Sequence, residues 1–494
     1  MGMRRCVGVL FVAVITAFVG ATPALGAPAL TPSSVISTVG AKASEPAVAV
    51  SADGRTLATW VAVRGEIETD AFSSCGRSTG YGKIEARLGT LAHGWRGVQV
   101  LGVDGESPMA AVGANGTAAV AWCPIGRSRG ALYVSIASPG RPFGRPRLVR
   151  NSGQYPPEGL EVQPDGRVVL IWSQTLEFEL TPLKNRIEFA LLRPHGGRPV
   201  IGAVSISSPE EAGVSVAETE AGDVLVDFPS PSGSAQDIAQ LRPSARAFAA
   251  PQAIELAGNT SMQTANLSAG PGGAALAFTA RGEHTDENEM VEQQPNSTFG
   301  SLALISQQRL VATGEQFTPY DARVAFPAGG ERVAVWLNIF GPSSVFEDVG
   351  RGPEIVMAAV RPAGAASFQG PVRLSVGPRR SGEPLIASAG TDTVVLWVQD
   401  EPGCKQRVYT AVGAVGTALA QVRALSGRYV PAKGECGTGS GQLALAGSGR
   451  YAIAGWIENS RLHITTIEGG IVANASRTAR TSSHTSGPAP RSRR

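Results

Sequence analysis

The apolar positions of this chain recur in eight units, and each unit carries one large aromatic residue at an equivalent place. These aromatic residues stand 50 to 62 residues apart, at Trp60, Trp122, Trp172, Phe228, Phe278, Trp336, Trp397 and Trp456. A glycine stands six or seven residues before each of them, at Gly54, Gly116, Gly166, Gly222, Gly272, Gly330, Gly390 and Gly449. Constant internal landmarks at this period are typical of a repeat architecture.

Each unit predicts four short strands, here named A to D in chain order. Strand A is an apolar run such as residues 47–50, and the glycine after it is three times part of Asp-Gly or Asn-Gly. Such pairs predict a two-residue hairpin loop, because these residues tolerate positive φ angles. Strand B, as at residues 168–172, is almost continuously apolar rather than alternating. This pattern predicts a strand that is buried on both faces.

Strand C follows a variable loop, and strand D closes the unit. We expect strand C at residues 84–86, 132–136, 187–192, 302–305, 355–360, 408–412 and 462–467. A Phe-x-x-Pro pattern at Phe143, Phe248 and Phe368 precedes strand D in three units.

Eight units of four antiparallel strands predict an all-β fold, an eight-bladed β-propeller. An open solenoid is the alternative, and the last unit decides between them because it lacks a strand D. Residues 32–40 match the strand D segment at 251–258. We therefore expect residues 33–40 to pair with residues 460–467, which closes the ring and removes an exposed sheet edge.

The first residues indicate export. Arg4 and Arg5 precede an apolar stretch over residues 6–20, followed by small residues up to Gly26 and Ala27. This pattern is typical of a secretory signal peptide, and the stretch is short for a membrane-spanning helix. We expect a signal peptide over residues 1–26, cleavage near Gly26 or Ala27, a propeller over 27–470, and a secreted or envelope-associated product without a transmembrane segment.

Charge is informative only when the chain is divided. After Glu468 there are no acidic residues but five arginines, so residues 471–494 form a basic tail rich in Ser and Thr, which we expect to be disordered. Outside the signal segment and the tail, 36 Lys and Arg stand against 40 Asp and Glu. This balance argues against nucleic acid as a partner. We expect a monomer.

The four cysteines outside the signal segment all map to one face of the predicted ring, the face of the B-to-C and D-to-A loops. Cys75 and Cys123 fall in neighbouring blades, as do Cys404 and Cys436. Three connectivities are open, and for an exported protein we favour Cys75 with Cys123 and Cys404 with Cys436. Metal binding is the alternative, but there is no C-x-x-C motif or cysteine and histidine cluster. We expect neither metal nor cofactor.

The Phe-x-x-Pro segments resemble the end of the Asp-box motif of bacterial sialidase-like propellers. The aspartate of that motif is missing before Phe143, Phe248 and Phe368, so the repeats look like degenerate copies. The resemblance implies the propeller fold. Sialidase chemistry requires an arginine triad, a tyrosine with a glutamate partner and an aspartate acid, and the sequence does not identify that set, so activity does not follow from the fold.

Tyrosines and carboxylates crowd the loops of the cysteine-bearing face, where they are typical of ligand recognition by stacking and hydrogen bonding. The candidate ligand-binding residues are Tyr81, Tyr155, Tyr320, Tyr429, Glu66, Asp70, Glu347 and Asp348. The alternative is that these are solvated loop residues.

Other motifs give weaker evidence of a function. The five histidines are scattered and support no Ser-His-Asp triad, and the acidic run at residues 286–289 lacks the glycine and spacing of a calcium loop. We favour a non-enzymatic extracellular propeller that binds a glycan, peptide or protein, and we assign no catalytic residue. A glycan-active hydrolase or lyase and a structural envelope protein are the alternatives.

Overall fold

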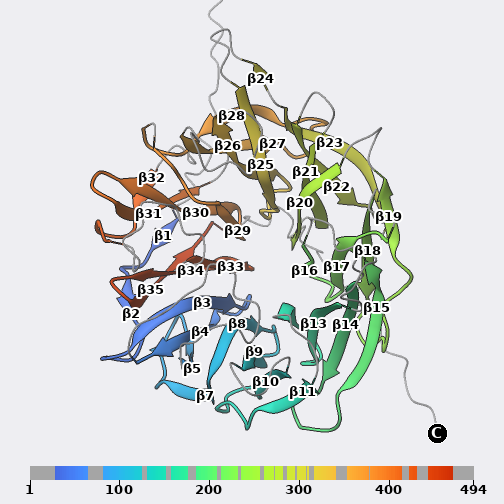
Figure 1. Ribbon diagram of the computed structural model, residues 1–494, viewed down its shortest axis with the longest axis vertical. Helices are drawn as coiled ribbons and strands as arrows, with labels where there is room; N and C mark the ends of the chain where they lie inside the picture. Colours follow the sequence, from blue (N-terminus) through green and yellow to red (C-terminus); the bar gives the residue numbers. More distant parts are fainter. Residues whose placement is uncertain are drawn as a thin grey trace, which may run out of the picture.

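The computed structural model consists of eight antiparallel sheets arranged in a ring around a central axis (Figure 1). The structure describes residues 28–64, 82–124, 131–151, 157–175, 185–207, 213–231, 235–255, 261–271, 273–281, 286–294, 298–307, 309–310, 316–340, 353–377, 379–413, 422–430 and 443–470. Within these ranges the chain contains strands and turns but no helix, so none is long and apolar enough to cross a membrane. The eight-bladed β-propeller predicted from the sequence is confirmed.

The strands group into blades in chain order. Blades 1 to 4 consist of β3 (Lys42–Val50), β4 (Arg55–Val63), β5 (Gly82–Thr90), β6 (Gly94–Trp95) and β7 (Gln99–Val103); β8 (Gly105–Val112), β9 (Ala118–Pro124), β10 (Ala131–Ala137) and β11 (Arg147–Asn151); β12 (Pro157–Val162), β13 (Val168–Thr175), β14 (Asn185–Leu192) and β15 (Val200–Ser207); and β16 (Ser215–Glu218), β17 (Val224–Pro229), β18 (Ala235–Leu241) and β19 (Gln252–Glu255).

Blades 5 to 8 complete the ring. They consist of β20 (Ser261–Gly270), β21 (Gly273–Arg281), β22 (Asp286–Gln293) and β23 (Phe299–Gln307); β24 (Arg309–Leu310), β25 (Gln316–Ala325), β26 (Arg332–Phe340), β27 (Glu354–Arg361) and β28 (Gln369–Arg373); β29 (Leu385–Ala389), β30 (Asp392–Glu401), β31 (Lys405–Gly413) and β32 (Val422–Ala424); and β33 (Leu443–Ser448), β34 (Tyr451–Glu458) and β35 (Arg461–Glu468), with β1 (Ala29–Leu30) and β2 (Ser34–Val35).

The repeated aromatic residue of strand B lies between neighbouring blades. Trp172 of β13 packs in one cluster with residues of blade 2, such as Val134, while Ile171 on the opposite side of the same strand packs with Val226 of blade 4. The side chains of Trp172, Ile171 and Val226 are each at most 1% exposed. Both faces of strand B are thus buried, which explains its continuous apolar sequence.

The turns between strands A and B differ from the two-residue loops expected from the sequence. In blade 1 the amide of Gly54 donates to the carbonyl of Ser51 at 2.9 Å, and the amide of Ser51 donates to the carbonyl of Arg55 at 3.0 Å. The loop therefore has three residues and ends on Gly54, whose φ is +81°. The same pattern recurs at Gly116 and Gly166. It is the three-residue hairpin that places glycine in the left-handed region.

One strand assignment from the sequence is wrong. Residues 302–305 were expected to be strand C of blade 5, but they belong to β23, the outer strand. Strand C is β22 (Asp286–Gln293), which contains the acidic run that the sequence places in a loop. Polar residues dominate β22, and Met290 and Val291 are its only apolar residues. A search for apolar runs therefore passes over it.

The N-terminal segment closes the ring as expected. Val35 of β2 pairs with His463 of β35, and the amide of Ile36 donates to the carbonyl of Leu462 at 3.0 Å. A second short strand that the sequence did not indicate, β1, pairs with Ile467 and Glu468. In Figure 1 the first strands (blue) lie against the last blade (red). The segment thus supplies the outermost strand of blade 8.

The cysteines that the structure describes lie on the expected face. Cys123 is near the end of β9, and Cys404 lies in the turn between β30 and β31. Cys75 and Cys436, the expected partners, lie outside the described residues, as do the signal segment and the basic tail. The two pairings stay predictions.

Ile36 gives a test of ring closure. Its side chain is 2% exposed and packs with Trp60 and Leu462 in the core between blades 1 and 8. Ile36→Ala leaves a cavity there, and we expect it to lower the free energy of unfolding by about 2–4 kcal/mol, measured by urea denaturation. Val39→Ala is the control, since Val39 is 84% exposed and its truncation should change stability little. Equal effects of the two substitutions would contradict the closure.

Candidate functional site

Two of the eight candidate ligand residues lie within the described part of the chain. Tyr320 belongs to β25 and is half-buried. Tyr429 follows β32 and is 5% exposed. The remaining candidates, Tyr81, Tyr155, Glu66, Asp70, Glu347 and Asp348, lie outside the described residues.

Tyr429 is held as part of the core between blades 7 and 8. Its amide donates to the carbonyl of Gln406 at 3.0 Å, and the amide of Gln406 donates back to the carbonyl of Tyr429 at 2.8 Å. The ring packs with Trp456 and Val408. Burial, followed by the negative charges of Glu458 and Asp400, raises the pKa of its hydroxyl. Its side chain therefore contributes packing rather than an exposed ring for stacking.

A cluster of charged groups lies on the same face of blade 7, and the sequence analysis missed it. Glu401 ends strand β30, and its side chain is 3% exposed. Its carboxylate accepts hydrogen bonds from the hydroxyl of Tyr409 at 2.7 Å and from Nη1 of Arg379 at 2.5 Å, and Nε of Arg428 lies 3.5 Å away. The two guanidinium groups come from the D-to-A connections on either side of blade 7.

The pKa shifts follow from this arrangement. Burial favours a higher pKa for Glu401, but the hydrogen bonds from Tyr409 and Arg379 and the charges of Arg379 and Arg428 outweigh it, so the pKa is lowered. Burial and the neighbouring Glu401 raise the pKa of Tyr409. Glu401 is thus an anion at neutral pH, and Tyr409 stays protonated as its hydrogen-bond donor.

The side chains of Arg379 and Arg428 keep outward-facing surface, with 40% and 54% exposed. One buried carboxylate therefore holds two cationic groups at the edge of this face. The sequence does indicate this cluster, since Glu401 ends strand B of blade 7, and Arg379 and Arg428 follow strand D of blades 6 and 7. Tyr409 lies within strand β31, so a search confined to tyrosines in loops does not find it.

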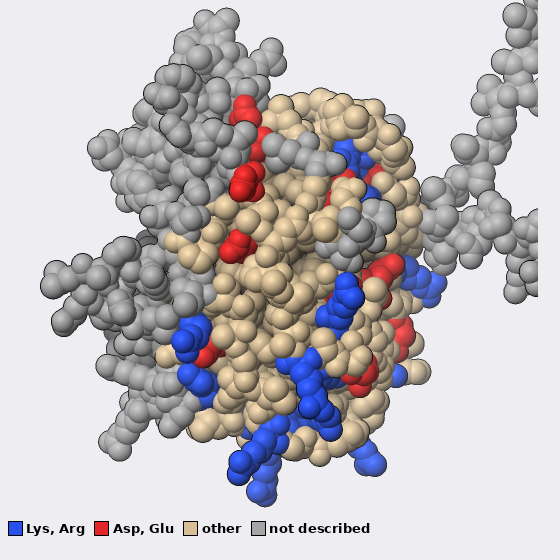
Figure 2. Space-filling model, turned by 90° about the vertical axis from the view of Figure 1, so that its right-hand side faces the viewer, with Lys and Arg blue, Asp and Glu red and all other residues tan. Residues whose placement is uncertain are grey.

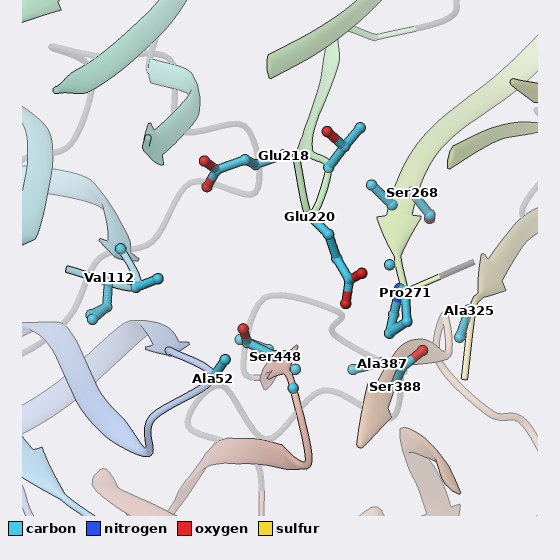
Figure 3. A pocket seen from close by; sticks show the side chains of 18 of the residues that line it. Ala52, Val112, Glu218, Glu220, Ser268, Pro271, Ala325, Ala387, Ser388 and Ser448 are labelled. Atoms are coloured by element: carbon cyan, nitrogen blue, oxygen red, sulfur yellow. The ribbon is translucent and has the colours of Figure 1, made fainter. Parts of the chain in front are cut away.

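The axis of the ring contains a cavity of about 530 Å³ at the end formed by the A-to-B turns (Figure 3). Every blade contributes to its wall, mostly through small residues such as Ala52, Gly113, Ala387 and Gly447. Small side chains at the inner strands are what leave this space open. Glu218 and Glu220 bring carboxylates to it, and Figure 3 shows Glu220 reaching toward its middle.

Glu218 does not stand alone beside the cavity. Burial, followed by the charges of Glu161 in the neighbouring blade and of Asp165, raises the pKa of Glu218. Burial also raises the pKa of Glu161. Two carboxyl groups from β12 and β16 therefore repel each other when both are ionised, which favours the protonated form of at least one.

The inner strands also contain β-bulges, which lie nearer the end of the axis opposite the A-to-B turns. Glu45, Ser107 and Asp321 have φ values of 48°, 50° and 53°, and each lies at a register shift of strand A. The amide of Ser107 donates to the carboxylate of Glu45 at 2.5 Å across two blades. Asp321 binds Arg323 at 3.0 Å, and Arg323 lies 3.7 Å from Glu383. Bulges of this kind change the direction of a side chain.

In the part of the chain that the structure describes, no three His, Cys, Asp or Glu residues are grouped so that they could hold a metal ion. The acids of the axis come in pairs or beside arginines instead.

No protein-family model and no curated protein sequence matches this chain. Among solved structures, a protein of unknown function from Dyadobacter fermentans DSM 18053 is 12% identical, with 78% of this chain and 99% of that chain covered and a TM-score of 0.40. A Hadza microbial sialidase is 13% identical over 72% of this chain and 63% of its own, with a TM-score of 0.37. An ulvan lyase of family PL25 is 10% identical over 74% and 91%, with a TM-score of 0.44. These similarities assign neither a family nor a function.

Glu218 predicts a specific pH dependence of stability. In the unfolded chain its carboxyl ionises near the ordinary value of 4.5, whereas the folded protein holds the proton to higher pH. The folded state then binds more protons, so stability falls as the pH rises above 4.5. Glu218→Gln removes this loss. We expect the variant to match the wild type at pH 4 and to be more stable by about 1–2 kcal/mol at pH 8.

Urea unfolding followed by tryptophan fluorescence at pH 4, 6 and 8 measures the effect. Glu220→Gln is the matched control at the same turn, because Glu220 is exposed, and it should keep the pH dependence of the wild type. An identical pH dependence in Glu218→Gln and wild type would contradict the burial of this carboxyl.

Proposed function

We propose that this chain is an exported, non-enzymatic β-propeller that binds a glycan, peptide or protein ligand on the face of the B-to-C and D-to-A loops. A rigid ring of blades with variable loops at one face is an arrangement that supports recognition. The fold itself does not select a ligand. The choice of this face rests on the residues of blade 7.

The observation that carries the proposal is the arginine pair at Glu401. Arg379 and Arg428 are fixed by one buried carboxylate, yet a large part of each side chain is exposed. Guanidinium groups held in this way present remaining N–H donors to an incoming carboxylate, and little side-chain entropy is lost on binding. We therefore expect the ligand to carry an acidic group, such as a uronic acid or an acidic side chain.

A thermal-shift screen tests this proposal. The probes are tetragalacturonate, N-acetylneuraminic acid, chitotetraose and an acidic hexapeptide, because a ligand that binds the native state raises the melting temperature. We expect an acidic probe to raise it and neutral chitotetraose to leave it unchanged. Arg428→Ala should weaken binding, so that the apparent affinity derived from the shift in melting temperature falls at least tenfold. The substitution removes a hydrogen-bond donor without exposing the core.

Arg461→Ala is the control, because Arg461 is an exposed arginine on the same side of blade 8 and lies outside the cluster. A shift that survives Arg428→Ala, or no shift with any acidic probe, would contradict a binding role for this face.

A glycan-active hydrolase or lyase is the second candidate, and the axial cavity favours it. Burial and a second carboxyl raise the pKa of Glu218, which is the direction required of a general acid. Release of reducing or unsaturated sugar in the same wells would support this role, and loss of that release in Glu218→Gln would assign it to the cavity.

A further inference from the structure

The turns between strands C and D in blades 1 to 4 carry a charge pattern that the proposed ligand face does not involve. These four connections, at residues 91–98, 138–147, 193–199 and 242–251, contain no Asp or Glu. They contain eight arginines, here called the arginine arc: Arg96, Arg141, Arg145, Arg147, Arg193, Arg198, Arg242 and Arg246. Seven of these are exposed, and Arg147 is half-buried.

The arginine arc has no counter-charges of its own. None of its eight side chains forms an ion pair with any residue that the structure describes. Elsewhere the pattern differs, since in blade 6 Arg323 lies 3.0 Å from Asp321, and Arg332 lies 2.5 Å from Glu292. The arginines of these four turns thus differ from Arg55, Arg150 and Arg167 in the same blades, which do have acidic partners.

Arginines connect the first three of these turns, and the fourth is bound by an arginine from the A-to-B turn of blade 3. Arg96 of blade 1 donates to the carbonyl of Gly140 in blade 2 at 3.3 Å, and Arg147 of blade 2 donates to the carbonyl of Arg193 in blade 3 at 2.9 Å. Arg167, from the A-to-B turn of blade 3, donates to the carbonyl of Ala245 in blade 4 at 2.5 Å. The turns thus form one continuous, mutually fixed row around the rim.

One arginine of the row acts on Arg167, which lies beside it. Burial lowers the pKa of Arg147. Burial also lowers the pKa of Arg167, where the charge of Asp165 opposes the shift and the charge of Arg193 adds to it. Figure 2, which views the molecule from the right-hand side of Figure 1, shows basic side chains over the lower half of this side, with some acidic side chains among them. A row of like charges without counter-ions attracts an anionic chain.

The side chains of the row favour one class of polyanion. Nucleic acid in single strands is held by exposed aromatic rings on which bases stack. The large rings of these turns pack against the blades instead: Phe143 is 8% exposed, Phe248 packs edge-on against Phe189 at 5.1 Å, and Trp95 is half-buried against the core between blades 1 and 8. Guanidinium groups without stacking platforms suit repeated carboxylate or sulfate groups, which they bind through paired hydrogen bonds.

We propose that the arginine arc binds an acidic polysaccharide laid along the rim of blades 1 to 4. The site lies on the face opposite the Glu401 cluster, so the two proposals stand independently. Several anionic groups must be presented in succession, because the arginines span four blades. A flexible glycan chain with an acid on successive sugars meets that requirement.

The test compares two variants of the full chain with equal loss of charge. The first is Arg141→Gln, Arg198→Gln and Arg242→Gln, which removes exposed members of the arc whose side chains form no ion pair or hydrogen bond with the residues that the structure describes. The second is Lys42→Gln, Lys405→Gln and Arg461→Gln, which removes three exposed cations on the opposite face. The five tail arginines are present in all proteins and contribute equally.

Binding to fluorescent polygalacturonate, dextran sulfate, neutral dextran and a 20-nucleotide poly-dT is measured by anisotropy at 50 and 200 mM NaCl. We expect the arc variant to lose at least tenfold in affinity for the acidic polysaccharides, with the slope of log K against log salt reduced by about two to three. The control variant should stay within twofold, and neutral dextran should not bind. Matching thermal melts establish that both variants fold.

Equal losses in the two variants would show an effect of net charge alone and would overturn the proposal. Absence of binding to both acidic polysaccharides would also overturn it. Tighter binding to poly-dT than to either acidic polysaccharide, lost in the arc variant, would overturn the polysaccharide as the partner and assign the arc to nucleic acid.

Discussion

The structure depends on burying both faces of strand B between neighbouring blades. Trp172 and Ile171 occupy opposite sides of β13, and each packs against a different blade. No blade can bury its own two faces, so every blade depends on two neighbours, and the first and last must meet. The N-terminal strands complete this requirement, because Val35 and Ile36 pair with β35 and bring the two ends of the chain into one sheet.

The same constraint decides where function can reside. With both faces of each blade occupied, chemistry is left to the axis, to the two loop faces and to the rim. At the axis, small side chains leave a cavity that Glu218 helps to line and toward whose middle Glu220 reaches. On one loop face, Glu401 fixes Arg379 and Arg428, while on the opposite face the arginine arc lacks any such partner among the described residues. Anionic partners would therefore meet two separate cationic surfaces and an acidic axis.

The architecture was accessible from the sequence because packing between blades imposes one pattern eight times. The aromatic residue, the turn glycine and the apolar strand B recur, and even the displaced closing strand repeats the sequence of another blade. The failures have physical reasons. Strand β22 is mostly polar, so a search for apolar runs missed it, and the three-residue turn at Gly54 uses the same residue types as a shorter loop.

The charged sites were less accessible, because they depend on residues that only the ring brings together. Glu161 and Glu218 are 57 positions apart in the chain, and nothing in either local sequence indicates the other. Glu401 belongs to strand β30, whereas Arg379 and Arg428 come from the two D-to-A connections beside it. The chain has nearly equal numbers of basic and acidic residues, so its composition does not indicate that the C-to-D turns of four consecutive blades contain basic but no acidic residues.

Hydrogen exchange of the backbone amides of β35 tests the closed ring most directly. These amides lie between β34 on one side and the N-terminal strands on the other. In a closed ring the amide of Thr466 in β35 donates to the hydroxyl of Thr31, and the amide of Ile36 in the N-terminal segment donates to the carbonyl of Leu462. A closed ring therefore predicts that both amides exchange as slowly as those of β34, because opening them requires breaking the ring. Fast exchange of Ile36 and Thr466 beside a protected β34 would show an open edge and contradict the account.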